Sequence, residues 1–122
     1  MSHIIVIVED SIYFRQIVSC TLKSAGYQIL EAENGRDALD KIQGVNVALF
    51  ICDLNMPIMD GLEFVKVLKQ QQHFKFTPVI MLTNESKDSK KQEGRHCGVK
   101  GWLQKPIEPE KLLHIVKKLL PN

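Results

Sequence analysis

The sequence lacks the features of membrane-spanning, secreted and thiolate-metal proteins. Its 122 residues include only three cysteines, an odd number that lie far apart and without the short spacing of a metal-binding motif. We therefore expect reduced thiols in a cytoplasmic protein. No apolar run approaches the about 20 residues that span a bilayer. A basic segment followed by a longer apolar stretch, the mark of a signal peptide, is also missing.

A strong excess of charge of one sign is missing too, since the formal net charge is only +2. Residues 1–61 hold eight acids and four bases, whereas residues 62–122 hold six acids and twelve bases. The second half has no interleaved aromatics, no helix-turn-helix pattern and no long basic run, so we predict no direct nucleic-acid binding. We interpret its basic residues first as a solvated face and second as a surface for an acidic protein.

Short apolar runs are present, and they alternate with helix-like segments. The runs cover residues 4–8, 47–52, 79–82 and 102–103, with a weaker one at 28–30. Runs of this kind are typical of strands in a parallel sheet that helices cover on both faces. Five strand–helix units in 122 residues predict one α/β domain with nothing left for a second.

Helix start and stop signals fit the same plan. The start signals are Ser11, Asn34, Asp60 with Glu63, and Pro109, and the stop signals are Gly26 and Gly44. Residues 86–96 lack an apolar stripe and include Gly94, so we predict a marginal fourth helix there. We expect it to be the most mobile element and to become ordered on activation or partner binding.

Reactive side chains follow the predicted strands at their carboxyl ends. Glu9 and Asp10 follow the first run, and Asp53 follows the third. Thr83 follows the fourth run, and Lys105 comes soon after the fifth. The carboxyl ends of parallel strands share one edge of the sheet, where open α/β sheets bind ligands. Carboxylates, a hydroxyl and an ammonium at this edge suit a divalent cation and a phosphoryl group.

Each of these residues alone is weak support, because a lone Asp or Lys-Pro is usually a turn residue and Thr is common in strands. Together and in order, four motifs resemble the receiver domain of two-component response regulators, specifically the single-domain chemotaxis type. These motifs are Val-Glu-Asp-Ser at 8–11, Asp-Leu-Asn-Met-Pro-Ile-Met-Asp-Gly at 53–61, Leu-Thr at 82–83 and Lys-Gly-Trp-Leu-Gln-Lys-Pro-Ile at 100–107.

The resemblance implies a flavodoxin-like (βα)5 fold. Its doubly wound five-stranded parallel sheet has strand order 2-1-3-4-5, which is carried over from the family. We expect a single receiver domain over residues 1–122. The resemblance also implies a cis peptide bond between Lys105 and Pro106, although only about 5–6% of X–Pro bonds in folded proteins are cis.

The resemblance further implies a phosphoryl-accepting signalling switch. Asp53 is implied to accept a phosphoryl group from the phosphohistidine of a histidine kinase. The implied ligands of Mg²⁺ are Asp10, Asp53, the backbone carbonyl of Asn55 and, mainly through water, Glu9. Lys105 and Thr83 are implied to contact phosphoryl oxygens, so that catalysis consists of positioning and charge neutralisation. The chain is then not an enzyme for external substrates, since it promotes only its own phosphorylation and dephosphorylation.

Four further residues are implied to control signal output and lifetime. Thr83 and Trp102 match the switch pair of the family, in which the aromatic residue is usually Tyr or Phe. The alternative is a half-buried Trp102 that simply packs against the fourth helix. Asn55 and Glu85 match positions that flank the path of the hydrolytic water. This polar pair favours a short-lived phosphate and the fast-cycling chemotaxis members.

The downstream partner is left open. A flagellar motor switch, a phosphotransfer protein in a relay and a separate kinase are all compatible, through a surface formed by the fourth helix, fifth strand and fifth helix. We expect a monomer or weak dimer. Competing interpretations are a receiver-like scaffold that binds independently of phosphate, and a receiver cut from a longer regulator. A third, an aspartyl-phosphate phosphatase, is disfavoured because Asn55 stands where such enzymes have a second Asp.

Overall fold

Five parallel strands form one sheet with the order β2-β1-β3-β4-β5, which confirms the predicted fold. The structure is a computed structural model that describes residues 3–84 and 98–120. The predicted fourth helix and Glu85 lie outside these residues. The elements are β1 Ile4–Val8, α1 Ile12–Ser24, β2 Gln28–Ala32, α2 Gly35–Lys41, β3 Leu49–Asp53, α3 Gly61–Lys69, the 3₁₀ helix η1 Gln72–Phe74, β4 Val79–Thr83, β5 Val99–Gln104 and α5 Pro109–Leu119.

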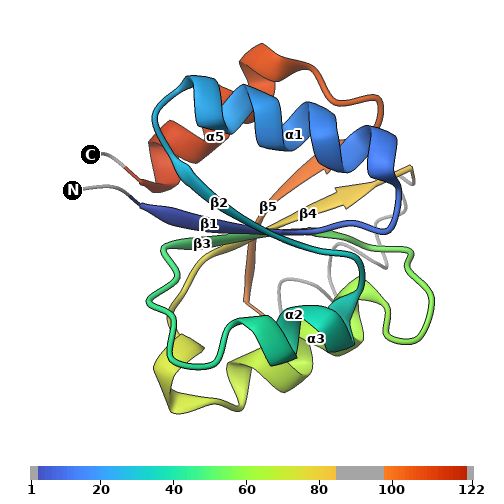
Figure 1. The fold of residues 1–122 in the computed structure, drawn as a ribbon, viewed down its shortest axis with the longest axis vertical. Helices are drawn as coiled ribbons and strands as arrows, with labels where there is room; N and C mark the ends of the chain where they lie inside the picture. Colours follow the sequence, from blue (N-terminus) through green and yellow to red (C-terminus); the bar gives the residue numbers. More distant parts are fainter. Residues whose placement is uncertain (1–2, 85–97, 121–122) are drawn as a thin grey trace.

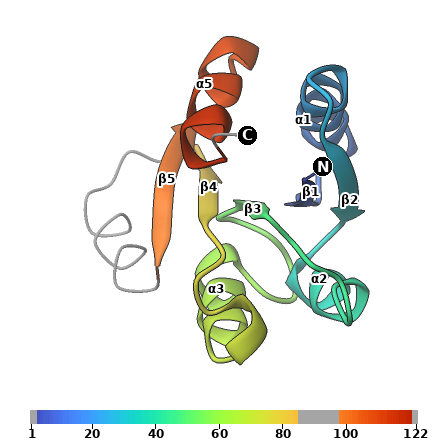
Figure 2. The same ribbon diagram turned by 90° about the vertical axis from the view of Figure 1, so that its left-hand side faces the viewer.

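Helices cover both faces of the sheet. Figures 1 and 2 show α1 and α5 on one face and α2 and α3 on the other. Because side chains alternate along a strand, Ile5 and Ile7 of β1 belong to the core beneath α1 and α5, whereas Val6 and Val8 belong to the core beneath α2 and α3. The central strands β3 and β4 are buried along their whole length, as their apolar runs predicted. No helix among the described residues is long and apolar enough to span a membrane.

The predicted helix caps are confirmed. The side chains of three N-cap residues accept hydrogen bonds from backbone N–H groups three residues later: Ser11 from Phe14 at 3.4 Å, Asn34 from Asp37 at 2.8 Å, and Asp60 from Glu63 at 2.9 Å. Gly26 and Gly44 have φ of +98° and +73°, the left-handed conformation that follows many helices. The Lys105–Pro106 bond is cis, as predicted, and Cys20 and Cys52 are free thiols.

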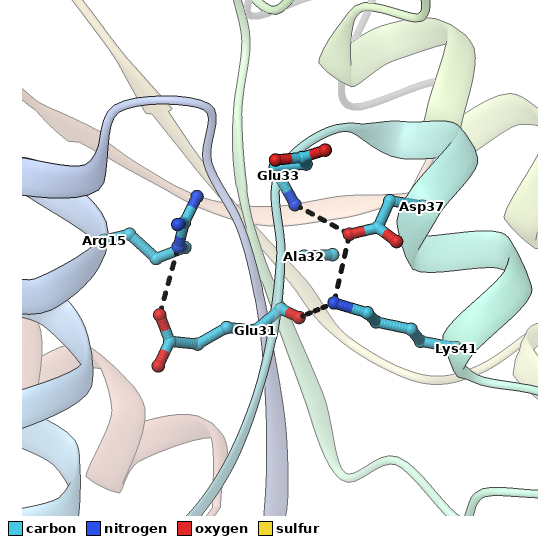
Figure 3. Close-up of a pocket in the computed structure, with 6 residues that line it drawn as sticks. All are labelled: Arg15, Glu31, Ala32, Glu33, Asp37 and Lys41. Atoms are coloured by element: carbon cyan, nitrogen blue, oxygen red, sulfur yellow. Dashed lines mark hydrogen bonds and ion pairs between the residues drawn. The ribbon is translucent and has the colours of Figure 1, made fainter.

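Strand β2 is one of the two edge strands of the sheet, and it extends to Ala32 rather than ending at residue 30. Side chains of α2 cover part of its outward-facing backbone (Figure 3). Lys41 Nζ donates to the Glu31 carbonyl at 2.9 Å, and the Glu33 N–H donates to Asp37 Oδ2 at 3.1 Å. Lys41 and Asp37 also form an ion pair at 3.1 Å, one helical turn apart. The end of this edge is therefore not an open row of backbone groups.

Candidate functional site

The turn between β1 and α1 carries the first two candidate residues. Glu9 is fully buried, whereas its neighbour Asp10 is exposed. The Glu9 N–H donates to the Ala32 carbonyl of β2 at 3.0 Å, and Glu9 Oε2 accepts a hydrogen bond from the Ser11 N–H at 3.1 Å. The Ser11 side chain caps α1, so the turn is held by the helix that follows it and by the neighbouring strand.

Asp53, the last residue of β3, is held by tight packing of the loop that follows. The Leu54 N–H donates to the Leu82 carbonyl of β4, and the Gly61 N–H donates to the Leu54 carbonyl, both at 2.8 Å. A Cβ atom at Gly61 would lie 2.5 Å from the Asp53 carbonyl oxygen, so only glycine allows this close approach. Asn55 lies in the intervening loop and is exposed.

Three carboxylates meet at the carboxyl edge of the sheet, together with one ammonium. Glu9, Asp10 and Asp53 each offer an oxygen, and these oxygens all lie within 4.8 Å of one another. Lys105 Nζ lies 2.8 Å from Glu9 Oε1 and 3.3 Å from Asp53 Oδ2. The Lys105 side chain is only 8% exposed. The predicted convergence of residues from three separate strand ends is therefore present in the structure.

Burial and crowding of like charges set the electrostatics of this cluster. Burial raises the pKa of Glu9 to about 7; the Asp53 charge adds to the rise, while Lys105 and the Ser11 N–H oppose it. Burial also acts to lower the pKa of Lys105, but Glu9 and Asp53 outweigh it, so that this pKa lies above its ordinary value. The Lys105 ammonium thus stays charged, while the Glu9 carboxyl group ionises only at a higher pH than usual.

The donor set fits a hard divalent cation. Glu9 Oε1 is buried, and the Lys105 ammonium lies 2.8 Å from it. Three carboxylates share this one ammonium among the described residues, so a further positive group near them would offset the remaining negative charge. Grouped carboxylate oxygens beside an exposed Asp10 suit Mg²⁺, which prefers oxygen ligands and retains several waters. Glu9, Asp10 and Asp53 are the residues that could hold it.

Thr83 and Trp102 lie on the neighbouring strands. Thr83 is buried at the end of β4, one residue after Leu82, which is the register partner of Asp53. The Thr83 carbonyl accepts a hydrogen bond from the Lys105 N–H at 2.8 Å, which ties β4 to the segment that carries the lysine. Trp102 is partly buried against the core beneath α2 and α3, and its buried indole Nε1 has no hydrogen-bond partner within the described part of the chain.

Two residues of α1 contact this site although the sequence did not single them out. Lys105 Nζ lies 4.4 Å from the centroid of the Phe14 ring, a cation–π distance. Arg15 Nη1 donates to the Glu9 carbonyl at 2.7 Å. A phenylalanine on an amphipathic helix usually belongs to the core, and an arginine there is usually solvated. Their place directly after the Ser11 cap, in the first turn and a half of α1, is the one signal that could have indicated them.

Comparisons with known proteins agree with this geometry. Residues 5–117 match the sequence profile of the response regulator receiver domain. The chain belongs to the response regulator receiver domain family. The receiver domain is similar to the solved structure of Vibrio cholerae chemotaxis protein CheY4, with a TM-score of 0.94 and 46% identity over 98% of this chain and 99% of that one. The predicted resemblance to chemotaxis-type receivers is therefore confirmed.

Two curated relatives extend the comparison. The receiver domain is 36% identical to chemotaxis protein CheY1 of Helicobacter pylori over 110 residues, which are 88% of this chain and 89% of that protein. It is 33% identical to protein PilG of Pseudomonas aeruginosa over 118 residues, which are 97% of this chain and 87% of that protein. Receiver domains are phosphoacceptors of two-component signalling that bind Mg²⁺ at an acidic pocket. The grouped carboxylates of this chain are consistent with that role.

Proposed function

We propose that the whole chain, residues 1–122, acts as a single cytoplasmic receiver that accepts a phosphoryl group on Asp53 from a histidine kinase, with Mg²⁺ as cofactor. The observation that carries this proposal is the cluster of three carboxylates with Lys105 Nζ 3.3 Å from Asp53 Oδ2. A carboxylate placed between a cation site and an ammonium is poised to take up a negatively charged group. We assign the cation to Glu9, Asp10, Asp53 and the backbone carbonyl of Asn55.

In the proposed transfer, an Asp53 oxygen forms a bond to phosphorus while the phosphorus–nitrogen bond of the kinase phosphohistidine breaks, and the imidazole nitrogen keeps that electron pair. The bound cation would supply positive charge that offsets the charge of the incoming phosphoryl group. Lys105 would leave part of its ion pair with the carboxylates and donate to a phosphoryl oxygen. The Thr83 hydroxyl would donate to another. These groups act by position and charge, which is what phosphoryl transfer chiefly requires.

The phosphate signal would then pass to the surface of the fifth strand and fifth helix. We assign the switch to Thr83 and Trp102, and the lifetime of the phosphate to Asn55 and Glu85. The movement needs only to shift an existing equilibrium between two arrangements. The chemotaxis names of the two similar proteins favour a diffusible messenger that binds a target protein such as a motor switch. Binding of nucleic acid or insertion into a membrane forms no part of the proposal.

The test is phosphorylation of the protein by a small phosphodonor, followed by intact mass. The wild type is expected to gain the mass of one phosphoryl group only when Mg²⁺ is present, with a change in Trp102 fluorescence. Asp53→Asn is expected to lose both signals, whereas the control Asp40→Asn, at an exposed position of α2, is expected to keep them. A wild type that binds Mg²⁺ but gains no mass would favour a scaffold whose binding is independent of phosphate.

A further inference from the structure

A polar cavity beside β2 contains the Arg15 side chain, which also bonds to the backbone of Glu9, one of the three grouped carboxylates. The cavity has a volume of about 280 Å³ and is lined by Arg15, Glu31, Ala32, Glu33, Asp37 and Lys41. Figure 3 shows Arg15 entering it from α1, while Lys41 and Asp37 enter from α2. None of these residues has a part in the proposed function. Among them, only Arg15 bonds through its side chain to the turn that carries Glu9 and Asp10, while Ala32 bonds to that turn through its backbone carbonyl.

Arg15 makes two directed contacts at once. Its Nε donates to Glu31 Oε1 at 3.0 Å, and its Nη1 donates to the Glu9 carbonyl at 2.7 Å. Glu31 is itself held on the other oxygen, since Ser19 Oγ lies 3.4 Å from Glu31 Oε2. A planar guanidinium that is fixed at Nε has little freedom left in the direction of Nη1. The Arg15 side chain is only 18% exposed, in keeping with a fixed position.

The Glu9 carbonyl belongs to the peptide group that joins Glu9 to Asp10. Because a peptide group is planar, a bond to its oxygen fixes the rotation of the whole plane and so the directions in which both carboxylate side chains start. The Glu9 N–H is already tied to the Ala32 carbonyl of β2. The backbone of Glu9 is thus anchored to β2 on both sides, once directly and once through Arg15 and Glu31.

We propose that Arg15 is a positioning residue for the divalent cation site, acting through the Glu9 carbonyl on the two carboxylates of Glu9 and Asp10. This inference rests on the proposed function, since it assumes that these carboxylates hold the cation. Partners that orient metal ligands typically contribute about 10- to 100-fold in metal affinity. The guanidinium ends in a cavity that water can enter, so loss of Arg15 leaves a carbonyl that water can satisfy and an intact core.

The charge of Arg15 and its positioning role predict opposite effects of its removal on the affinity for the cation. If Arg15 acted only through its positive charge, its removal would strengthen cation binding, because a like charge near the site would be gone. If it positions the turn, removal weakens binding in spite of the charge. Arg15→Lys keeps the charge but cannot make both contacts, and Arg15→Gln removes the charge as well. The positioning role predicts weaker binding in both variants.

The experiment is calorimetric titration of the unphosphorylated protein with Mg²⁺. Arg15→Lys and Arg15→Gln are expected to weaken Mg²⁺ affinity by about tenfold. The matched control is Lys41→Met, which removes a cation from the same cavity and a hydrogen bond to a β2 carbonyl. Because Lys41 does not bond to Glu9 or Asp10, the control is expected to retain wild-type affinity within about a factor of two. Urea denaturation shows whether each variant is folded.

Phosphorylation at saturating Mg²⁺ gives a second readout. The rate in Arg15→Lys is expected to return close to the wild-type rate, because only cation binding is impaired. Wild-type affinity in both Arg15 variants, an equal loss in Lys41→Met, or a rate that stays low at saturation would overturn the positioning role and leave the proposed function standing. A wild type that binds no Mg²⁺ would overturn the proposed function and this inference with it.

Discussion

Two partly buried lysines lie at opposite ends of the parallel strands, and they differ in the groups that surround them. Lys105, at the carboxyl edge, contacts the carboxylates of Glu9 and Asp53. Lys69, at the end of α3 and the amino edge, donates to the backbone carbonyls of Phe74 and Thr77. Among the described residues, no carboxylate forms an ion pair with Lys69.

The different neighbours move the two pKa values in opposite directions. Burial lowers the pKa of Lys69, and the charge of Lys100 adds to this effect. For Lys105 the carboxylates overcome burial and raise the pKa. Lys69 thus links η1 to the segment before β4 through two neutral carbonyls. Lys105 instead stays charged beside Asp53, the proposed phosphorylation site. The two residues are of the same type, and their neighbours determine the direction in which each pKa moves.

Removal of the ammonium at each edge tests this contrast most strongly. Lys105→Met is expected to slow phosphorylation by a small phosphodonor by about 100-fold or more, because a fixed charge directed at a developing anion is lost. Lys69→Met is expected to change the rate by less than about twofold at a temperature at which both variants are folded. The rates follow from intact mass against time, and similar losses in the two variants would remove the distinction.

Lys69 is expected to matter for stability, although it is expected to matter little for the rate of phosphorylation. Lys69→Met leaves two carbonyls near η1 without their donor, which is expected to lower the free energy of unfolding by about 1–3 kcal/mol. Lys69→Arg keeps hydrogen-bond donors at this place and is the matched control. Urea denaturation measures both, and a Lys69→Met variant as stable as the wild type would show that water replaces the ammonium at no cost.

The pH dependence of stability sharpens the comparison further. The pKa of Glu9 rises from 4.5 to about 7 in the fold, so the folded state binds this proton more tightly than the unfolded chain does. The associated stability is fully present below pH 4.5 and is lost as the pH rises through about 7. We expect a loss of about 2–3 kcal/mol in the cation-free protein.

Denaturation at a series of pH values measures this loss. Glu9→Gln is expected to abolish it, and saturating Mg²⁺ is expected to reduce it in the wild type, since a bound cation favours the ionised carboxylate. Lys69→Met is expected to keep the wild-type slope, because Lys69 lies at the other edge. A cation-free wild type whose stability does not fall over this range would contradict the raised pKa of Glu9.

Much of the fold could be predicted because its causes are local in the sequence. The buried strands are continuous apolar runs, and the caps at Ser11, Asn34 and Asp60 use side chains that bond within one helical turn. The cluster of Glu9, Asp10 and Asp53 was also accessible, since the ends of parallel strands must share an edge. The order of the strands, in contrast, came from the family resemblance.

What sequence reasoning missed depends on contacts between distant residues. Arg15 meets Glu31 across sixteen positions, and Phe14 lies beneath an ammonium from the other end of the chain. Neither contact leaves a periodic pattern in the sequence. Each residue also has a simpler explanation on an amphipathic helix, as a solvated arginine or a core phenylalanine. Lys69 was equally ordinary as a basic residue in the last turn of a helix. These three roles exist only in the folded arrangement.

The covered end of β2 has a consequence for how the protein behaves at high concentration. An edge strand with free backbone groups is a template on which a strand of another molecule can add, the first step of many aggregates. Here an incoming strand would have to displace Lys41 from the Glu31 carbonyl and Asp37 from the Glu33 N–H, and break their ion pair as well. One turn of helix α2 thus hinders the addition of a strand at this end of β2.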